Sequence, residues 1–300
     1  MESQRRFTPT LSCEFFPPND VRSLERLEVA YAKLRVLRPA YVSVTYGAGG
    51  STQDRTFATV EALQGHSAIP VAPHLTCVGS TRGGVRAILE RYRRQGIERL
   101  VALRGDLPSG NPMAGELRYA SDLVAFIRET MGDAFHIEVA AYPEFHPQCQ
   151  GAAGDLLNLK RKVEAGADAA ITQYFFNADA YFRLVDSLEA LGVTIPVVPG
   201  IMPIANYQQL ARFSERCGAE IPRWLHHRLA DFGDDTAALR AFGVEVVADI
   251  CRRLLEQGAP GLHFYTLNRA DPTLAIWRAL GEPRFAAPEP SPIPRAAQPA

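Results

Sequence analysis

Two carboxylic residues, Glu14 and Asp106, each come at the end of a short apolar run and could act together in one site. Glu14 is flanked by Cys13 and by residues 15–18 (Phe-Phe-Pro-Pro), whereas Asp106 follows Arg104 by two positions. Apolar surroundings favour the protonated form of a carboxyl group, so we expect Glu14 to hold a proton. A nearby cation and backbone donors favour the ionised form, so we expect Asp106 to be charged. Carboxyl groups in different protonation states can take different roles in a reaction.

A second group of polar residues lies in a predicted helix, residues 155–162 (Asp-Leu-Leu-Asn-Leu-Lys-Arg-Lys). The spacing of Asp155, Asn158 and Lys162 is i, i+3 and i+7, which places them on one helix face with Arg161 beside them. A carboxylate, an amide and cations suit the ribose hydroxyls and the pyrophosphate of a cofactor. On composition alone, a solvated helix face is an equal alternative. Together with the polar strand ends, the pattern favours an extended cofactor.

The elements that would hold these residues form a regular series. Short apolar runs recur at intervals of roughly thirty residues, and amphipathic segments long enough for helices lie between them. This alternation predicts a single (β/α)8 TIM barrel, an α/β fold whose active site lies at the carboxyl ends of the strands. The predicted strands are residues 10–16, 41–46, 71–77, 100–104, 137–142, 170–175, 195–201 and 262–266. Extra helices are expected between the seventh and eighth strands, where the gap is about twice as long as the others.

Length and composition fit this architecture. We expect an N-terminal segment (residues 1–9), a catalytic barrel (10–282) and a disordered Pro/Ala-rich tail (283–300). A net charge of −1 gives no basic face for nucleic acid. The polar start and the lack of an apolar run of about 18 residues predict a cytoplasmic protein with no membrane contact. The 5 scattered cysteines are expected to be free, buried thiols.

Three other kinds of site that could lie at the mouth of a barrel fit the sequence less well. The glycine-rich residues 46–52 follow a strand but lack the third glycine and the acidic partner of a dinucleotide fold. No lysine ends a predicted strand, as a Schiff-base aldolase requires. His74, Asp106, His146 and His263 could bind a metal in a hydrolase or lyase, but they lack the usual ligand spacing. We therefore predict no metal site and keep the metal enzyme as an alternative.

Several segments, taken in order along the chain, resemble the methylenetetrahydrofolate reductase family. The matching residues are 14–18, 43–48, 73–77, 102–108, 119–123, 141–144, 155–162, 171–173 and 264–269. So many ordered matches over nearly the whole chain make coincidence implausible.

The resemblance implies a flavoprotein of the short, prokaryotic type. It would bind FAD and pass a hydride from NADH or NADPH to 5,10-methylenetetrahydrofolate in a ping-pong cycle, giving 5-methyltetrahydrofolate for methionine synthesis. The sequence does not decide between the two nicotinamides. Family analogy suggests a homo-oligomer, and no feedback by S-adenosylmethionine is expected. A barrel that binds flavin or folate only as a partner subunit is the remaining alternative.

The resemblance also implies roles for individual residues. Glu14 would protonate the folate, Asp106 would stabilise the resulting cation, and Gln173 would orient folate and nicotinamide. The folate pocket would include Gln209, Phe213 and Arg269. Thr45 would contact the nicotinamide, and FAD would contact Tyr46, Ala48, His74, Arg104, Gly105, Asp106, Tyr119, Ala120, Tyr142, His146, Asp155, Asn158, Arg161 and Lys162.

Overall fold

The computed structural model describes residues 1–46, 50–66, 68–105, 115–144, 146–149 and 151–285. Two residues of the predicted site, Ala48 and Asp106, lie outside these ranges, as do residues 286–300 of the predicted tail.

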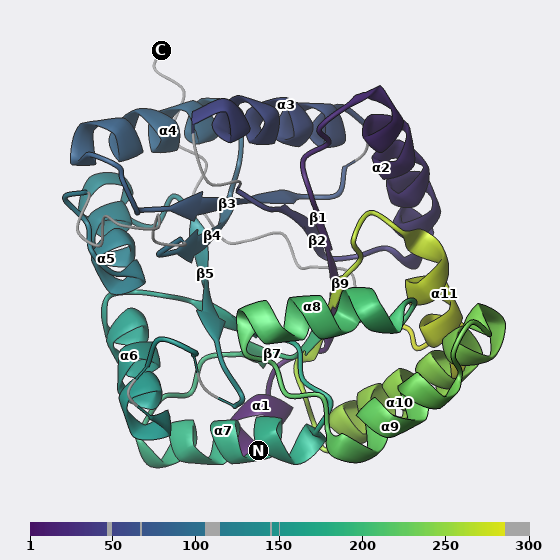
Figure 1. The fold of residues 1–300 in the computed structure, drawn as a ribbon. Helices are drawn as coiled ribbons and strands as arrows, with labels where there is room; N and C mark the ends of the chain where they lie inside the picture. The colour runs from purple at the N-terminus through teal and green to yellow at the C-terminus, as the bar shows by residue number, and fades with distance from the viewer. Residues whose placement is uncertain (47–49, 67, 106–114, 145, 150, 286–300) are drawn as a thin grey trace.

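The strands form one parallel sheet that closes on itself, in the order β7-β6-β5-β4-β3-β2-β1-β9-β8. The predicted (β/α)8 barrel is therefore confirmed, and its strands lie inside a ring of helices in Figure 1. The strands are β1 (Thr10–Phe15), β2 (Tyr41–Val44), β3 (Val71–Thr76), β4 (Arg99–Leu103), β5 (His136–Ala141), β6 (Ala169–Thr172), β7 (Val197–Val198), β8 (Gly200–Ile201) and β9 (Gly261–Tyr265).

The seventh strand position of the barrel is divided by Pro199 into two short strands, β7 and β8. Proline has no N–H to donate to a ladder, so a strand cannot run through it unbroken. The Pro199 carbonyl still accepts a hydrogen bond from the His263 amide (3.0 Å), and β7 pairs with β6 while β8 pairs with β9. The predicted strand over residues 195–201 is thus shorter and interrupted, but the barrel closes through it.

Helices surround the strands and connect one to the next (Figure 1). Asp20 caps α2 by accepting a hydrogen bond from the Ser23 amide (2.7 Å). Between β8 and β9 lie α8, α9 and α10, which confirms the extra helices predicted there. The elements are α1 (Glu2–Arg5), α2 (Val21–Leu34), η1 (Arg35–Leu37), α3 (Gly50–His66), α4 (Arg82–Arg94), α5 (Ala120–Met131), α6 (Ala152–Glu164), α7 (Ala178–Ala190), α8 (Tyr207–Cys217), α9 (Arg223–Asp231), α10 (Thr236–Glu256) and α11 (Ala270–Ala279).

The main core lies between the outer face of the barrel and these helices. Cys13 and Phe15 of β1 are fully buried there, as are Leu75 of β3 and Leu100 of β4. All five cysteines are free, as predicted, but Cys149 and Cys217 are only partly buried.

The short helix α1 docks on the amino end of β7, at the face of the barrel opposite the mouth. Gln4 is 1% exposed, and its side-chain amide donates to the Ile195 carbonyl (3.0 Å) and accepts from the Val197 amide (2.8 Å). These bonds satisfy backbone groups that Pro196 and the short β7 leave without a neighbouring strand.

We predict that Gln4→Ala lowers the free energy of unfolding by about 1–3 kcal/mol, because it leaves buried backbone groups unpaired. Urea denaturation measures this change. Glu2→Ala, an exposed position in the same helix, is the control and should change stability by less than about 0.5 kcal/mol. Equal effects of the two substitutions would contradict the docking role of Gln4.

Candidate active site

A large cavity of about 1000 Å³ opens at the carboxyl ends of β3, β4 and β5. Ligand sites in proteins range from roughly 300 to 1,000 Å³, so this cavity suits a long ligand. Most of the residues to which the resemblance assigns FAD line it: Tyr46, Arg104, Gly105, Tyr119, Ala120, Tyr142, His146, Asp155, Asn158, Arg161 and Lys162. Other polar residues also line the cavity, among them Gln53 of α3, Ser121 of α5, Ser80 and Gln148. They could not be predicted from the sequence, because no spacing rule marks single polar residues.

The polar face predicted on α6 forms one wall of this cavity. Asp155 accepts a hydrogen bond from the His146 amide (2.9 Å), and Arg161 donates to the side-chain oxygen of Asn158 (3.0 Å). Lys162 is half-buried and donates to the Ala140 carbonyl. Burial lowers the pKa of Lys162 to about 8, and the Asp155 carboxylate opposes this shift. Near neutral pH the Lys162 amine in this cavity is therefore a cation.

Gly105 gives the cavity room beside β4. Its φ is +89°, a backbone conformation that favours glycine, and a Cβ there would lie 3.0 Å from the Thr76 Cβ. With cations on α6 and a glycine at the end of β4, the donor set fits an anionic dinucleotide that approaches the backbone closely.

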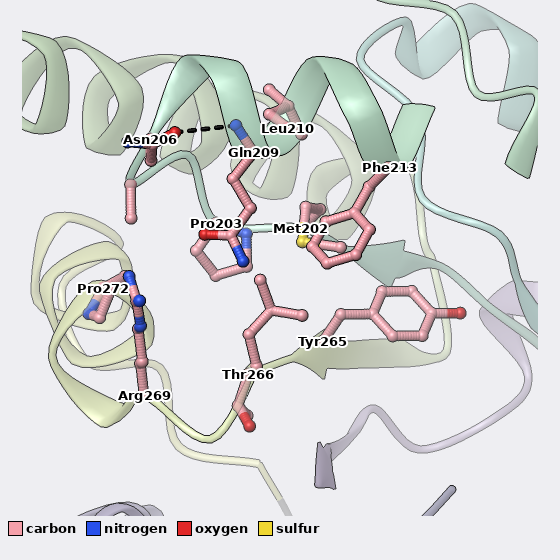
Figure 2. Close-up of a pocket in the computed structure, with 12 residues that line it drawn as sticks. Met202, Pro203, Asn206, Gln209, Leu210, Phe213, Tyr265, Thr266, Arg269 and Pro272 are labelled. Carbon is pink, nitrogen blue, oxygen red and sulfur yellow. Dashed lines mark hydrogen bonds between the residues drawn. The ribbon is translucent and has the colours of Figure 1, made fainter. Parts of the chain in front are cut away.

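A smaller pocket lies between α8 and the carboxyl end of β9 (Figure 2). The side chains of Gln209, Phe213 and Arg269, which the resemblance assigns to folate, all line it. Asn206 caps α8 by accepting a hydrogen bond from the Gln209 amide (2.8 Å), which fixes the start of the helix that carries Gln209 and Phe213. The pocket thus offers an aromatic ring, an amide and a cation.

Glu14 lies inside the barrel, 6% exposed, and touches the smaller pocket through its neighbours. It is the register partner of Tyr265, and its carbonyl accepts a hydrogen bond from the Thr266 hydroxyl (2.6 Å); both Tyr265 and Thr266 line that pocket. Glu14 is therefore held directly beside two residues that line this pocket.

The surroundings of Glu14 differ from the apolar ones that its sequence neighbours suggested. Along a strand, side chains alternate between faces, so Cys13 and Phe15 point to the helices while Glu14 points inward. There, Glu14 Oε2 lies 3.4 Å from His74 Nε2 and 3.8 Å from His263 Nε2. The apolar box predicted around its carboxyl group was wrong.

The two histidines differ in what holds them. Burial lowers the pKa of His74, with Glu14 opposing and His263 adding to the shift, so His74 is a neutral imidazole at neutral pH. His263 is fully buried and its Nδ1 lies 2.7 Å from the Ser12 hydroxyl, a hydrogen bond that fixes its ring. Both rings restrict where the Glu14 carboxyl group can turn.

Four described residues of the predicted site line neither cavity: Glu14, Thr45, His74 and Gln173. Thr45 follows β2, where its amide donates to the Phe15 carbonyl (3.0 Å). Gln173 follows β6, where its amide donates to the Ala141 carbonyl (2.8 Å) and its side-chain oxygen accepts from the Tyr174 amide (3.0 Å). Both residues still belong to the carboxyl-end face of the barrel.

The described residues also bear on two other kinds of function. Within the described ranges, no three His, Cys, Asp or Glu side chains converge as metal ligands would. None of the described helices has the length and apolar character needed to cross a bilayer.

The model of one protein family, methylenetetrahydrofolate reductase, matches residues 2–281. The 5,10-methylenetetrahydrofolate reductase of Escherichia coli K12 is 41% identical over 273 residues, which cover 90% of each chain. Methylenetetrahydrofolate reductase (NADH) 1 of Arabidopsis thaliana is 37% identical over 283 residues, which cover 90% of this chain and 48% of that protein.

Among solved structures, the fold is similar to that of an uncharacterized protein from Clostridium thermocellum that binds two copies of 5-methyl-5,6,7,8-tetrahydrofolic acid. The TM-score is 0.66 at 15% identity, and the match covers 94% of this chain and 96% of that one. At this identity the likeness concerns the fold alone.

The lowered pKa of Lys162 makes anion binding in the large cavity depend on pH. The amine is charged below about pH 8 and neutral above it, and a bound anion shifts that midpoint upward because it favours the charged form. We predict that ADP, measured by calorimetry, binds about tenfold more weakly at pH 9 than at pH 7.

Lys162→Met should weaken ADP binding at pH 7 and remove most of its pH dependence. Lys160→Met is the matched control, since Lys160 is partly exposed and lies 3.8 Å from Glu164, with which it forms an ion pair. A wild-type pH dependence in Lys162→Met would show that another group is responsible.

Proposed function

Because the chain belongs to the methylenetetrahydrofolate reductase family, we propose that it reduces 5,10-methylenetetrahydrofolate to 5-methyltetrahydrofolate, with FAD as cofactor and NADH or NADPH as the hydride donor. The observation that carries this proposal is the buried Glu14, held against Tyr265 and Thr266 of the smaller pocket, together with a separate large cavity that has a basic wall. The large cavity suits a dinucleotide, and the smaller pocket offers an aromatic ring, an amide and a cation that would contact a folate.

FAD would be held in the large cavity. Lys162 and Arg161 would bind the pyrophosphate, Asp155 and Asn158 the ribose hydroxyls, and Gly105 would let the ligand approach the end of β4. Once bound, FAD supplies a hydride carrier that nicotinamide and folate use in turn, as in a ping-pong cycle. His74, to which the resemblance also assigns FAD, would act instead through its contact with Glu14.

Glu14 would be the general acid. Opening the folate ring to a reactive iminium requires a proton on the leaving nitrogen, and Glu14 would deliver it. The neutral His74 and the anchored His263 would keep the Glu14 carboxyl group turned toward the smaller pocket. Asp106 would stabilise the cation that forms, as an ionised carboxylate can.

The remaining residues would position the substrates. Phe213 would pack on a ring of the folate, and Gln209 and Arg269 would donate hydrogen bonds to its polar edge. Gln173 and Thr45 would orient the ligands from the ends of β6 and β2. The name of the Arabidopsis relative specifies NADH, so NADH is the first donor to test. We expect a homo-oligomer that works in the cytoplasm for methionine synthesis.

A visible spectrum tests the proposal directly. The purified protein, supplemented with FAD, should be yellow, should bleach with NADH or NADPH in the absence of oxygen, and should recover its colour when methylenetetrahydrofolate is added. A colourless protein with stoichiometric metal would favour the metal hydrolase or lyase. A yellow protein that no nicotinamide bleaches would favour a binding role only.

We predict that Glu14→Gln still allows nicotinamide to bleach the flavin but slows folate-dependent recovery of the colour by at least about 100-fold, because only that half-reaction needs the proton. Stopped-flow absorbance measures the two halves separately, so the nicotinamide half is the internal control. Equal losses in both halves would mean that Glu14 is not the acid.

A further inference from the structure

The interior of the barrel contains buried polar atoms that have no hydrogen-bond partner among the described residues. They are the Tyr41 hydroxyl, Ser43 Oγ, His74 Nε2, Glu138 Oε2 and His263 Nε2, in side chains that are at most 7% exposed. Barrel interiors are usually filled by branched apolar side chains. Leaving a buried polar atom without a partner is costly, and ordered water commonly meets that need in polar interiors.

Contacts inside the barrel join several of these residues. Tyr41 of β2 stacks on His263 of β9 (ring centroids 6.3 Å apart), and its ring lies 4.8 Å from the Arg99 guanidinium of β4. Neither β9 nor β4 is a neighbour of β2 in the sheet, so these contacts exist only inside the barrel. The apolar part of the interior, Ala72, Val101 and Ile171, belongs to β3, β4 and β6.

A continuous series of polar groups leads inward from Glu14. Glu14 Oε2 lies 3.8 Å from His263 Nε2, and His263 Nδ1 lies 2.7 Å from the Ser12 hydroxyl. Ser12 is the register partner of Tyr41. The Tyr41 hydroxyl makes no direct hydrogen bond, yet burial and the Glu138 carboxylate raise its pKa, while Ser12 acts in the opposite direction. Tyr41 therefore lies near both Ser12 and Glu138.

The series reaches solvent at the other end of the barrel. Glu138 Oε1 accepts a hydrogen bond from Arg99 (2.8 Å) and lies 4.0 Å from His136 Nε2. Arg99 and His136 are the first residues of β4 and β5, and their side chains are 27% and 28% exposed. The exit is thus on the amino-end face, opposite both cavities.

We propose that ordered waters and the side chains of Ser12, Tyr41, Glu138 and His263 form a proton path. The path would reprotonate Glu14 from the amino-end face of the barrel. The inference rests on the proposed role of Glu14 as the general acid. In each folate reduction, Glu14 gives one proton to the folate nitrogen and becomes a carboxylate. A hydronium ion at the amino-end face releases one proton into the path, and the water nearest Glu14 transfers one proton to its carboxylate, so charge and atoms balance.

The arrangement gives the enzyme a route that does not compete with its ligands. FAD and folate would fill the two cavities on the mouth side of Glu14, so bulk water reaches the carboxylate from that side only when the ligands leave. Entry from the opposite face can proceed while the site is occupied. Tyr41 and Glu138 are positioning residues in this scheme, since they touch neither substrate nor cofactor.

The test compares the first folate half-reaction with later turnovers in the FAD-loaded enzyme. Tyr41→Phe removes one hydroxyl from the middle of the path and keeps the ring. The first half-reaction should stay at the wild-type rate, because it does not need a proton resupplied through the path, whereas later turnovers should slow about tenfold with a larger solvent deuterium isotope effect. Flavin bleaching by nicotinamide should not change.

Tyr92→Phe is the matched control, because Tyr92 is also fully buried with a hydroxyl that has no partner among the described residues, but it packs on Phe57 outside the barrel. It should behave as wild type. If Tyr41→Phe does not fold, Glu138→Gln replaces it, with the same expected result. Wild-type turnover in the path variant, or equal slowing by Tyr41→Phe and Tyr92→Phe, would overturn the proposal.

Two further measurements separate this inference from the function on which it rests. A high-resolution crystal structure should contain waters within hydrogen-bonding distance of the Tyr41 hydroxyl and Glu138 Oε2, and a dry interior would overturn the path. If Glu14→Gln leaves the folate half-reaction intact, the acid is wrongly assigned. If Glu14→Gln blocks that half-reaction but Tyr41→Phe leaves later turnovers unaffected, only the path fails.

Discussion

The alternation of side chains along β1 is the constraint on which the rest of the site depends. Cys13 and Phe15 anchor the strand to the helix layer, and this fixes Ser12 and Glu14 on the inner face. Pairing of β1 with β2 and β9 then brings Tyr41, Ser43, His263 and Tyr265 beside them. A shift of one residue in register would turn Glu14 into the apolar layer and Phe15 into the barrel.

Much of the architecture could be predicted from periodicity. Parallel strands covered on both faces have near-continuous apolar runs, and the order of runs and amphipathic segments indicated the barrel and its extra helices. The face of α6 was also predictable, because i, i+3 and i+7 spacing is local, and its four polar residues do line one cavity. The break at Pro199 could have been anticipated from the missing amide, but the pairing of β7 and β8 on either side of it depends on the whole sheet.

The surroundings of Glu14 could not be predicted in the same way. Sequence neighbours suggested an apolar box, yet in a strand the nearest residues in the chain point to the opposite face. The residues that do surround Glu14 come from β3 and β9, far away in the chain, and no local pattern links them. The position of His74 could not be predicted either. The resemblance assigns it to FAD, but it lies against Glu14 and outside the large cavity.

The docking of α1 has a consequence for how the barrel assembles. Gln4 forms hydrogen bonds with Ile195 and Val197, which follow it by 191 and 193 positions. Thr10 of β1 pairs with Gly261 of β9. Closing such long loops costs conformational entropy, and this cost opposes the formation of these contacts. Residues near the amino end therefore pair with residues from the second half of the chain, and we expect the two sheet edges to join late in folding. Until then β1, which carries Glu14, has an unpaired edge that can associate with other chains.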